Sequence, residues 1–203
     1  MFEPITKNIF RWGTNDPESG YMMYSHLLLE KDRAVLIDPV EIPDLIKMVR
    51  ILGEPLAVIM TNYSHLRGCP SISRKLQVPL FMPEIKAVDE DDKLVSVFLE
   101  LYDVKNFIQY DEKTELPLGI ESYVIKGRHE IALKFHNFLI VGDSAYGIDG
   151  KLAFYLLGFY PDENNAKSGA TAAALLPIMK KTMADGLLSG HNEDIPSGLQ
   201  SLI

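Results

Sequence analysis

The sequence contains a single cysteine, Cys69, in 203 residues. One thiol forms no internal disulfide and builds no cysteine-based zinc site, so a reducing compartment is its natural environment. No apolar run is long enough to span a membrane, which argues against a membrane partner. The first residues carry neither the basic region nor the apolar core of a secretory signal. We therefore expect a cytoplasmic protein.

The sequence also lacks an excess of positive charge. Lys and Arg number 20 against 28 Asp and Glu, a formal net charge of -8. Nucleic-acid binding needs clustered Lys and Arg, so the composition argues against a nucleic-acid partner. Repeats, low-complexity tracts and Pro- or Ser-rich linkers are absent as well. With 47% hydrophobic residues, we expect residues 1–203 to form a single domain around one substantial core.

Short apolar runs and helical spacing predict a mixed α/β chain. The predicted strands cover residues 7–12, 21–30, 33–37, 57–60, 79–82, 107–110, 120–125, 131–135, 138–141 and 186–189. The predicted helices cover residues 43–52, a segment from Arg67 through Leu76, 94–101, about 166–183 and 197–203. Residues 161–165 are expected to form a loop, and Pro177 to kink or divide the helix around it. This order favours two sheets packed face to face with helices outside.

Polar side chains collect where the predicted strands end or begin. The residues concerned are Asn62, Ser64, His65 and Arg67 after the strand at 57–60, Asp143 after 138–141, His191 after 186–189, and Arg128 and His129 before 131–135. Each has a structural explanation, such as a helix cap, a turn cap or a surface loop. However, α/β folds place their chemistry at such strand ends, because rigid elements hold the side chains there. The recurrence of four polar tips therefore favours one shared site.

Five short motifs, in this order, carry a family resemblance. They are Val35-Leu-Ile-Asp-Pro39, Val58-Ile-Met-Thr61, the segment 127–133, Leu139-Ile-Val-Gly-Asp143 and Leu188-Ser-Gly-His191. With them the chain resembles the metallo-β-lactamase superfamily over nearly its whole length. The resemblance implies an α/β fold of the αβ/βα four-layer sandwich type, with two mixed β-sheets and helices on the outer faces. It also implies a centre of one or two metal ions between the edges of the sheets.

At the positions of that family's metal-binding motif, this chain carries residues that do not suit a metal ion. The family pattern Thr-His-x-His-x-Asp-His falls on this chain so that its metal-binding positions become Asn62, Ser64, Leu66 and Arg67. Leucine cannot ligate, arginine is a permanent cation, and Asn and Ser are poor zinc ligands. The family's next ligand falls on Arg128, or on His129 if the loop is shifted by one residue. We therefore expect that the standard two-zinc centre is lost.

Three residues at ligand positions still suit a metal. Asp143 matches the bridging carboxylate of the family and His191 its last ligand, with His129 as the third candidate. Three such ligands could hold one divalent ion, zinc in this family, with an open position. The resemblance thus leaves two expectations for the cofactor: none, or one zinc ion held by His129, Asp143 and His191.

Two functions follow from this altered site. The first is a divergent hydrolase of unknown substrate, with Asp143, His65 and His129 as catalytic candidates. The second is a non-catalytic relative that binds a small anionic molecule or a protein partner, with the ligand held by Asn62, Arg67 and Arg128. The apolar segment 154–160 would suit a homodimer contact under either function.

Overall fold

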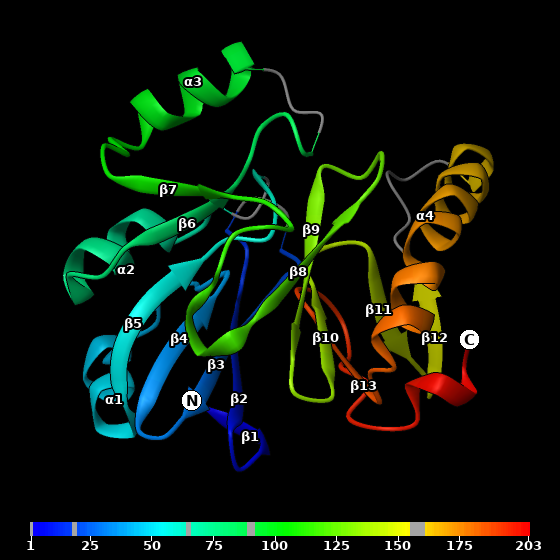
Figure 1. Ribbon diagram of the computed structural model, residues 1–203, viewed down its shortest axis with the longest axis horizontal. Coiled ribbons are helices and arrows are strands. Elements are labelled where there is room, and N and C mark those ends of the chain that lie inside the picture. Colours follow the sequence, from blue (N-terminus) through cyan, green and yellow to red (C-terminus); the bar gives the residue numbers. More distant parts are fainter. Residues whose placement is uncertain (1, 18–19, 64–65, 89–91, 155–160) are drawn as a thin grey trace.

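The computed structural model describes residues 2–17, 20–63, 66–88, 92–154 and 161–203. It is a sandwich of two sheets with helices on the outer faces (Figure 1). The fold class expected from the sequence is therefore confirmed. The segment 155–160, which makes up most of the expected homodimer contact, lies outside the described residues, as do Ser64 and His65.

The larger sheet has seven strands in the order β1 to β7. Their bounds are Glu3–Thr6, Ile9–Asn15, Met22–Glu30, Arg33–Ile37, Glu54–Ile59, Leu80–Pro83 and Phe107–Tyr110. Strands β1 to β4 are antiparallel neighbours, and β4 to β7 run parallel. The strands predicted at residues 21–30 and 33–37 form the antiparallel pair β3 and β4. Strand β1 was not predicted, and β2 continues to Asn15, beyond the end of the strand predicted at residues 7–12.

Helices α1 (Leu45–Leu52), α2 (Cys69–Leu76) and α3 (Asp92–Leu101) connect the parallel strands. Helix α1 buries Leu45 and Val49, and this spacing of four residues presents one apolar stripe to the sheet. Strand β4 is buried over Ala34–Ile37, because a parallel strand is covered on both faces. The polar ends of β4 and β5 are thereby fixed at one edge of the sandwich.

The smaller sheet has four strands in the order β13, β10, β9 and β8. Their bounds are Glu121–Ile125 for β8, Glu130–Phe135 for β9, Phe138–Val141 for β10 and Gly186–Ser189 for β13. A two-residue turn at His136 and Asn137 joins β9 to β10. Strands β10 and β13 run parallel, so the residues that follow them, Asp143 and His191, emerge at the same edge.

The C-terminal part differs from the sequence prediction in three places. Strands β11 (Ala145–Ile148) and β12 (Lys151–Phe154) form a separate hairpin that was not predicted. Helix α4 runs from Pro161 to Thr182, so residues 161–165 are helical and Pro177 does not divide the helix. Proline suits a first helical turn because its missing N–H has no partner there. The predicted last helix is reduced to the single turn η3 (Leu199–Ser201), and η2 (Pro117–Gly119) is a second such turn.

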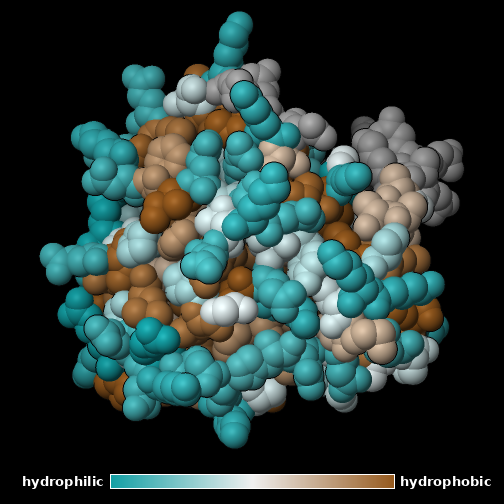
Figure 2. All heavy atoms as spheres, viewed as in Figure 1, coloured by the Kyte–Doolittle hydropathy of each residue, from teal (hydrophilic) through white to brown (hydrophobic). Residues whose placement is uncertain are grey.

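Two hydrophobic clusters hold the layers together. The larger fills the space between the sheets and under α1 and α2, with Trp12, Leu36 and Phe135 among its members. The smaller lies between the four-stranded sheet and α4, with Leu139, Leu175 and Met179. On the face seen in Figure 2, hydrophilic side chains project over much of the surface, with hydrophobic residues visible between them. No helix in the described part of the chain is both long and apolar enough to cross a membrane.

Candidate functional site

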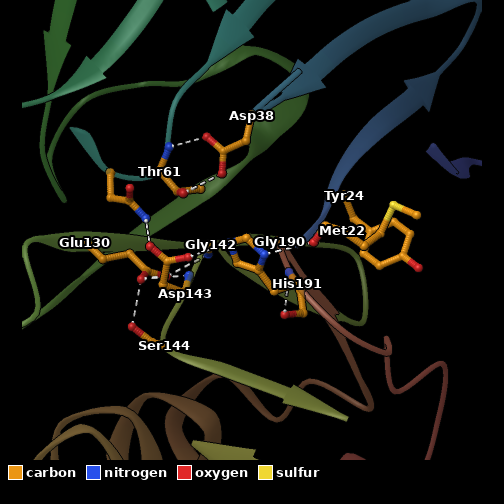
Figure 3. Close-up of polar contacts among 12 residues, drawn as sticks. Met22, Tyr24, Asp38, Thr61, Glu130, Gly142, Asp143, Ser144, Gly190 and His191 are labelled. Atoms are coloured by element: carbon orange, nitrogen blue, oxygen red, sulfur yellow. Dashed lines mark hydrogen bonds and ion pairs between the residues drawn. The ribbon is translucent and has the colours of Figure 1, made fainter. Parts of the chain in front are cut away.

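A buried carboxylate fixes the start of the loop after β5. Asp38 follows β4 with a φ of 45°, and its side chain is almost fully buried. Its two oxygens accept hydrogen bonds from the Thr61 amide, at 2.8 Å, and from the Thr61 hydroxyl (Figure 3). The loop that carries Asn62 to Arg67 therefore leaves β5 in a direction set by the neighbouring strand.

A second buried carboxylate fixes the loop after β10. Glu130, at the start of β9, is 1% exposed. It accepts hydrogen bonds from the Gly142 amide at 2.7 Å, the Asp143 amide at 3.1 Å and the Ser144 hydroxyl at 2.8 Å (Figure 3). An isolated β-bridge pairs Glu130 with Asn62. One side chain thus holds the backbone of Asp143 beside the loop after β5.

Asp143 joins the ends of three strands from both sheets. Its carboxylate accepts a hydrogen bond from the Asn62 amide nitrogen at 3.2 Å. The other oxygen lies 3.1 Å from His191 Nε2. The two partners are still accessible, with 17% of the Asp143 side chain and 27% of the His191 side chain exposed. The structure therefore brings together three of the residues proposed from the sequence: Asn62, Asp143 and His191.

The backbone around His191 determines how the imidazole is oriented. Its Nδ1 lies 2.9 Å from the Met22 carbonyl oxygen. A carbonyl only accepts, so Nδ1 carries the proton and donates it. The His191 amide donates to the Ser189 hydroxyl at 3.2 Å. Nε2 is consequently the ring nitrogen that faces Asp143 and the interior of the site.

Arg67 reaches the same place from the loop before α2. Its Nη1 donates to the Tyr24 carbonyl at 2.7 Å and lies 3.4 Å from the Asp38 carbonyl. Its Nη2 lies 3.5 Å from the Gly190 carbonyl and 3.4 Å from His191 Nε2. Burial lowers the pKa of the guanidinium, and the carboxylates of Asp38 and Asp143 oppose that shift. Three of the four contacts described for Arg67 thus go to main-chain carbonyls and the fourth goes to the His191 side chain, while Asp143 acts on it through its charge.

The remaining site candidates lie around the turn between β8 and β9. Arg128 is half-buried and His129 is exposed. His129 has a φ of 54°, which is the left-handed region that tight turns use. His65, proposed as catalytic, lies outside the described residues. The structure therefore supports a grouping of Asn62, Arg67, Asp143 and His191. Arg128 and His129 lie in the turn directly before Glu130.

The architecture has well-matched counterparts among solved structures. A metallo-β-lactamase from Pontibacter korlensis aligns over 100% of this chain and 97% of its own, with a TM-score of 0.70 and 15% sequence identity. The DIM-1 metallo-β-lactamase exposed to ceftazidime aligns over 100% and 95%, with a TM-score of 0.70 and 14% identity. A metallo-β-lactamase from Hirschia baltica aligns over 100% and 94%, with a TM-score of 0.67 and 15% identity. No protein-family model and no curated protein matches the sequence.

The chain has the metallo-β-lactamase fold. The fold alone does not carry the chemistry of these enzymes, because function depends on the site residues. Of the three candidate ligands for a single zinc, the structure places Asp143 and His191 in contact. Within the described ranges, no group of three or more His, Cys, Asp or Glu side chains is placed to hold a metal ion. His129 therefore does not complete a three-ligand set with them there.

The donor chemistry of this metallo-β-lactamase fold does not fit a zinc centre in the described residues. The amide of Asn62 is hydrogen-bonded to Asp143, and Leu66 is buried. Arg67 brings a positive charge into the space beside His191. A divalent cation there would face a guanidinium in a partly desolvated site, which is electrostatically unfavourable.

Three contributors to the site were not identified from the sequence. Glu130 stands directly before the strand predicted at residues 131–135, and a glutamate in that position could have indicated a carboxylate that binds backbone amides. Asp38 was named only within the motif Val35-Leu-Ile-Asp-Pro39. The carbonyls of Met22 and Tyr24 leave no signal in the sequence, because every residue has a carbonyl. Their role depends on the spatial position of β3.

Proposed function

We propose that this chain is a metal-independent protein that binds a small molecule at the sandwich edge, with Asp143 and His191 as the groups that contact the ligand. The observation that carries the proposal is the accessibility of this pair. The Asp143 and His191 side chains are 17% and 27% exposed and lie 3.1 Å apart, while the neighbouring carboxylates of Asp38 and Glu130 are buried and hydrogen-bonded within the protein.

The site has two arginines, Arg67 and Arg128, that could bind an anionic group of the ligand. The four contacts described for the Arg67 guanidinium are with protein groups. Arg128 is the other arginine proposed from the sequence, and it is the cation that we propose for an anionic group of the ligand. Arg128 is half-buried, two residues before Glu130. Its planar guanidinium suits a carboxylate or phosphate group. The ligand class that we propose is therefore a small molecule with an anionic group for Arg128 and a hydroxyl that can donate to Asp143 or contact the imidazole of His191.

Binding without metal has two measurable consequences. Elemental analysis of protein purified without an affinity tag should find no stoichiometric zinc, and neither EDTA nor added zinc should shift the melting temperature. Phosphate or citrate should raise the melting temperature of the wild type, and this increase should be lost in Arg128→Ala and in His191→Ala. One or two bound metal ions per chain would contradict metal independence. Stabilisation of both variants by phosphate or citrate to the same extent as the wild type would contradict the anion site.

His136→Ala is the matched control for these measurements. His136 also faces a carboxylate, with Nε2 2.9 Å from Glu30, but it lies in the turn between β9 and β10. That turn follows β9, whereas the site lies at its start and beyond the end of β10. A His136→Ala variant that keeps the response to phosphate or citrate shows that removal of an imidazole is not sufficient to abolish binding.

Hydrolysis is a second function that one observation favours. Because Nδ1 of His191 donates to Met22, the neutral ring carries its lone pair on Nε2, the nitrogen nearest Asp143. This nitrogen could take a proton from water as the oxygen attacks an ester carbonyl, and could then return the proton to the leaving alkoxide. A turnover of p-nitrophenyl acetate in EDTA that disappears in His191→Ala and persists in His136→Ala would support it. Absence of turnover leaves the binding function alone.

A further inference from the structure

The acceptors around Arg67 come from both sheets. Tyr24 lies in β3 and Asp38 directly after β4, both in the seven-stranded sheet. Gly190 and His191 follow β13 of the four-stranded sheet. Figure 3 shows Met22 and Tyr24 beside Gly190 and His191, where the two sets of strands meet. The guanidinium therefore occupies a junction that no single sheet encloses.

The backbone already joins the sheets at this point by one direct bond. The Tyr24 amide donates to the Gly190 carbonyl at 2.8 Å. The same two residues provide carbonyls to Arg67, at 2.7 Å from Tyr24 and 3.5 Å from Gly190. A carbonyl such as that of Gly190 has two lone pairs and can accept from both donors. The cation thus adds to an inter-sheet contact that the Tyr24–Gly190 bond and the His191–Met22 hydrogen bond also make.

The planar shape of the guanidinium suits this junction. Nη1 faces Tyr24 and Asp38, while Nη2 faces Gly190 and His191. An arginine presents five N–H donors in a fixed plane, whereas the three donors of lysine radiate from one nitrogen. One lysine nitrogen could not sit within hydrogen-bond distance of acceptors that two separate nitrogens reach here. The contacts therefore require the shape of arginine and not only its charge.

We propose that Arg67 is a fixed cationic clamp that joins the ends of the two sheets and positions the His191 imidazole, so that this edge of the fold closes without a metal ion. Arg67 acts here through His191 and is a positioning residue. This role does not depend on whether the site binds a small molecule. A failed test of the proposed function would therefore leave it untouched.

Hydrogen exchange at the inter-sheet bond tests the clamp directly. The Tyr24 amide should exchange at least about 10-fold faster in Arg67→Ala and in Arg67→Lys than in the wild type, because local opening becomes easier. The wild type should show the same protection with and without EDTA. Arg67→Lys serves as the second variant because it keeps the charge if removal of the side chain prevents folding.

A second readout separates positioning from general stability. The Nδ1 proton of His191 donates to the Met22 carbonyl, so its imidazole N–H signal should be visible by NMR in the wild type. We expect this signal to disappear in Arg67→Lys while the dispersed spectrum of the core remains. Arg74→Ala is the control, because Arg74 is exposed and has one described hydrogen bond, to the Asp103 carbonyl at 3.4 Å.

Three outcomes would overturn the clamp. One is wild-type exchange of the Tyr24 amide in both Arg67 variants. Another is retention of the His191 signal in Arg67→Lys, which would show that charge alone is sufficient. The third is loss of wild-type protection in EDTA, which would show that a metal ion closes this edge of the fold.

Discussion

Two kinds of carboxylate meet at the sandwich edge and differ in what they contact. Asp38 and Glu130 are 3% and 1% exposed, and both accept hydrogen bonds from backbone amides and a hydroxyl. Asp143 is more accessible and meets the side chains of Asn62 and His191. The first kind determines the course of the loops, and the second remains available to a ligand. Stability and binding should therefore separate when the two kinds are mutated.

Removal of the Glu130 carboxylate should have the largest effect on stability. Glu130→Ala leaves the Gly142 amide, the Asp143 amide and the Ser144 hydroxyl without their acceptor in a buried place. Unsatisfied buried donors cost about 1–3 kcal/mol each and are not additive, so we expect a loss on the order of 3 kcal/mol. Urea unfolding measures it. Glu130→Gln keeps one acceptor and should lose less; an equal loss in both variants would contradict the capping role.

Asp38 should show the same behaviour on a smaller scale. Asp38→Ala leaves the Thr61 amide and hydroxyl without an acceptor, and we expect a loss of about 2 kcal/mol. Asp38→Asn is the informative comparison, because asparagine tolerates the positive φ of 45° at this position. Asparagine also retains an acceptor for the Thr61 amide, so its loss should be about half as large. Equal unfolding free energies for Asp38→Ala and the wild type would refute the cap.

Asp143→Asn should affect binding far more than stability. The substitution keeps the size of the side chain but removes the charge that faces His191 at 3.1 Å. Because both side chains are partly exposed, we expect a stability loss of less than about 1 kcal/mol. The melting-temperature response to phosphate or citrate should change, since the imidazole of His191 loses its partner. A loss as large as that of Glu130→Ala would place Asp143 with the structural carboxylates.

The fold was predictable from the sequence because buried strands appear in it as short apolar runs. The bounds of β4, β7, β10 and β13 agree with the apolar runs that predicted them. Strand β1 was missed because Glu3–Thr6 contains no apolar run, and β11 and β12 were missed because each has only four residues, with Gly147 in one and Lys151 in the other. The loop predicted at residues 161–165 was wrong because proline and asparagine are turn formers that also suit the start of a helix.

The site was predictable only in part. The family resemblance pointed to Asn62, Arg67, Asp143 and His191, and strand order alone brings them to one edge. The contacts of Arg67 were not predictable, because its acceptors are main-chain carbonyls of residues distant in sequence. Only the packing of β3 against the tip of β13 shows where the guanidinium donates.

The smallest expected effect concerns a carboxylate far from the site. Glu121, on β8, accepts a hydrogen bond from the Tyr123 hydroxyl and one from Lys134. The Tyr123 hydrogen bond is the main cause that lowers the pKa of Glu121, followed by Lys134 after a partial opposing effect of burial. A lowered folded-state pKa means that the stabilisation is present above the unfolded pKa of about 4.3. It is lost as the pH falls through the folded-state value.

Tyr123→Phe isolates this contribution. The Glu121 side chain is 55% exposed, so solvent screening limits the loss at pH 7 to roughly 0.5 kcal/mol. The difference between variant and wild type should shrink as the pH falls through the lowered folded-state pKa of Glu121, because the carboxyl group then becomes protonated in both folded and unfolded chains. Urea unfolding at pH 7 and pH 3 measures it, with Lys134→Ala as the matched variant that removes the other partner. A difference that stays constant with pH would mean that the hydroxyl of Tyr123 acts through packing and not through the charge of Glu121.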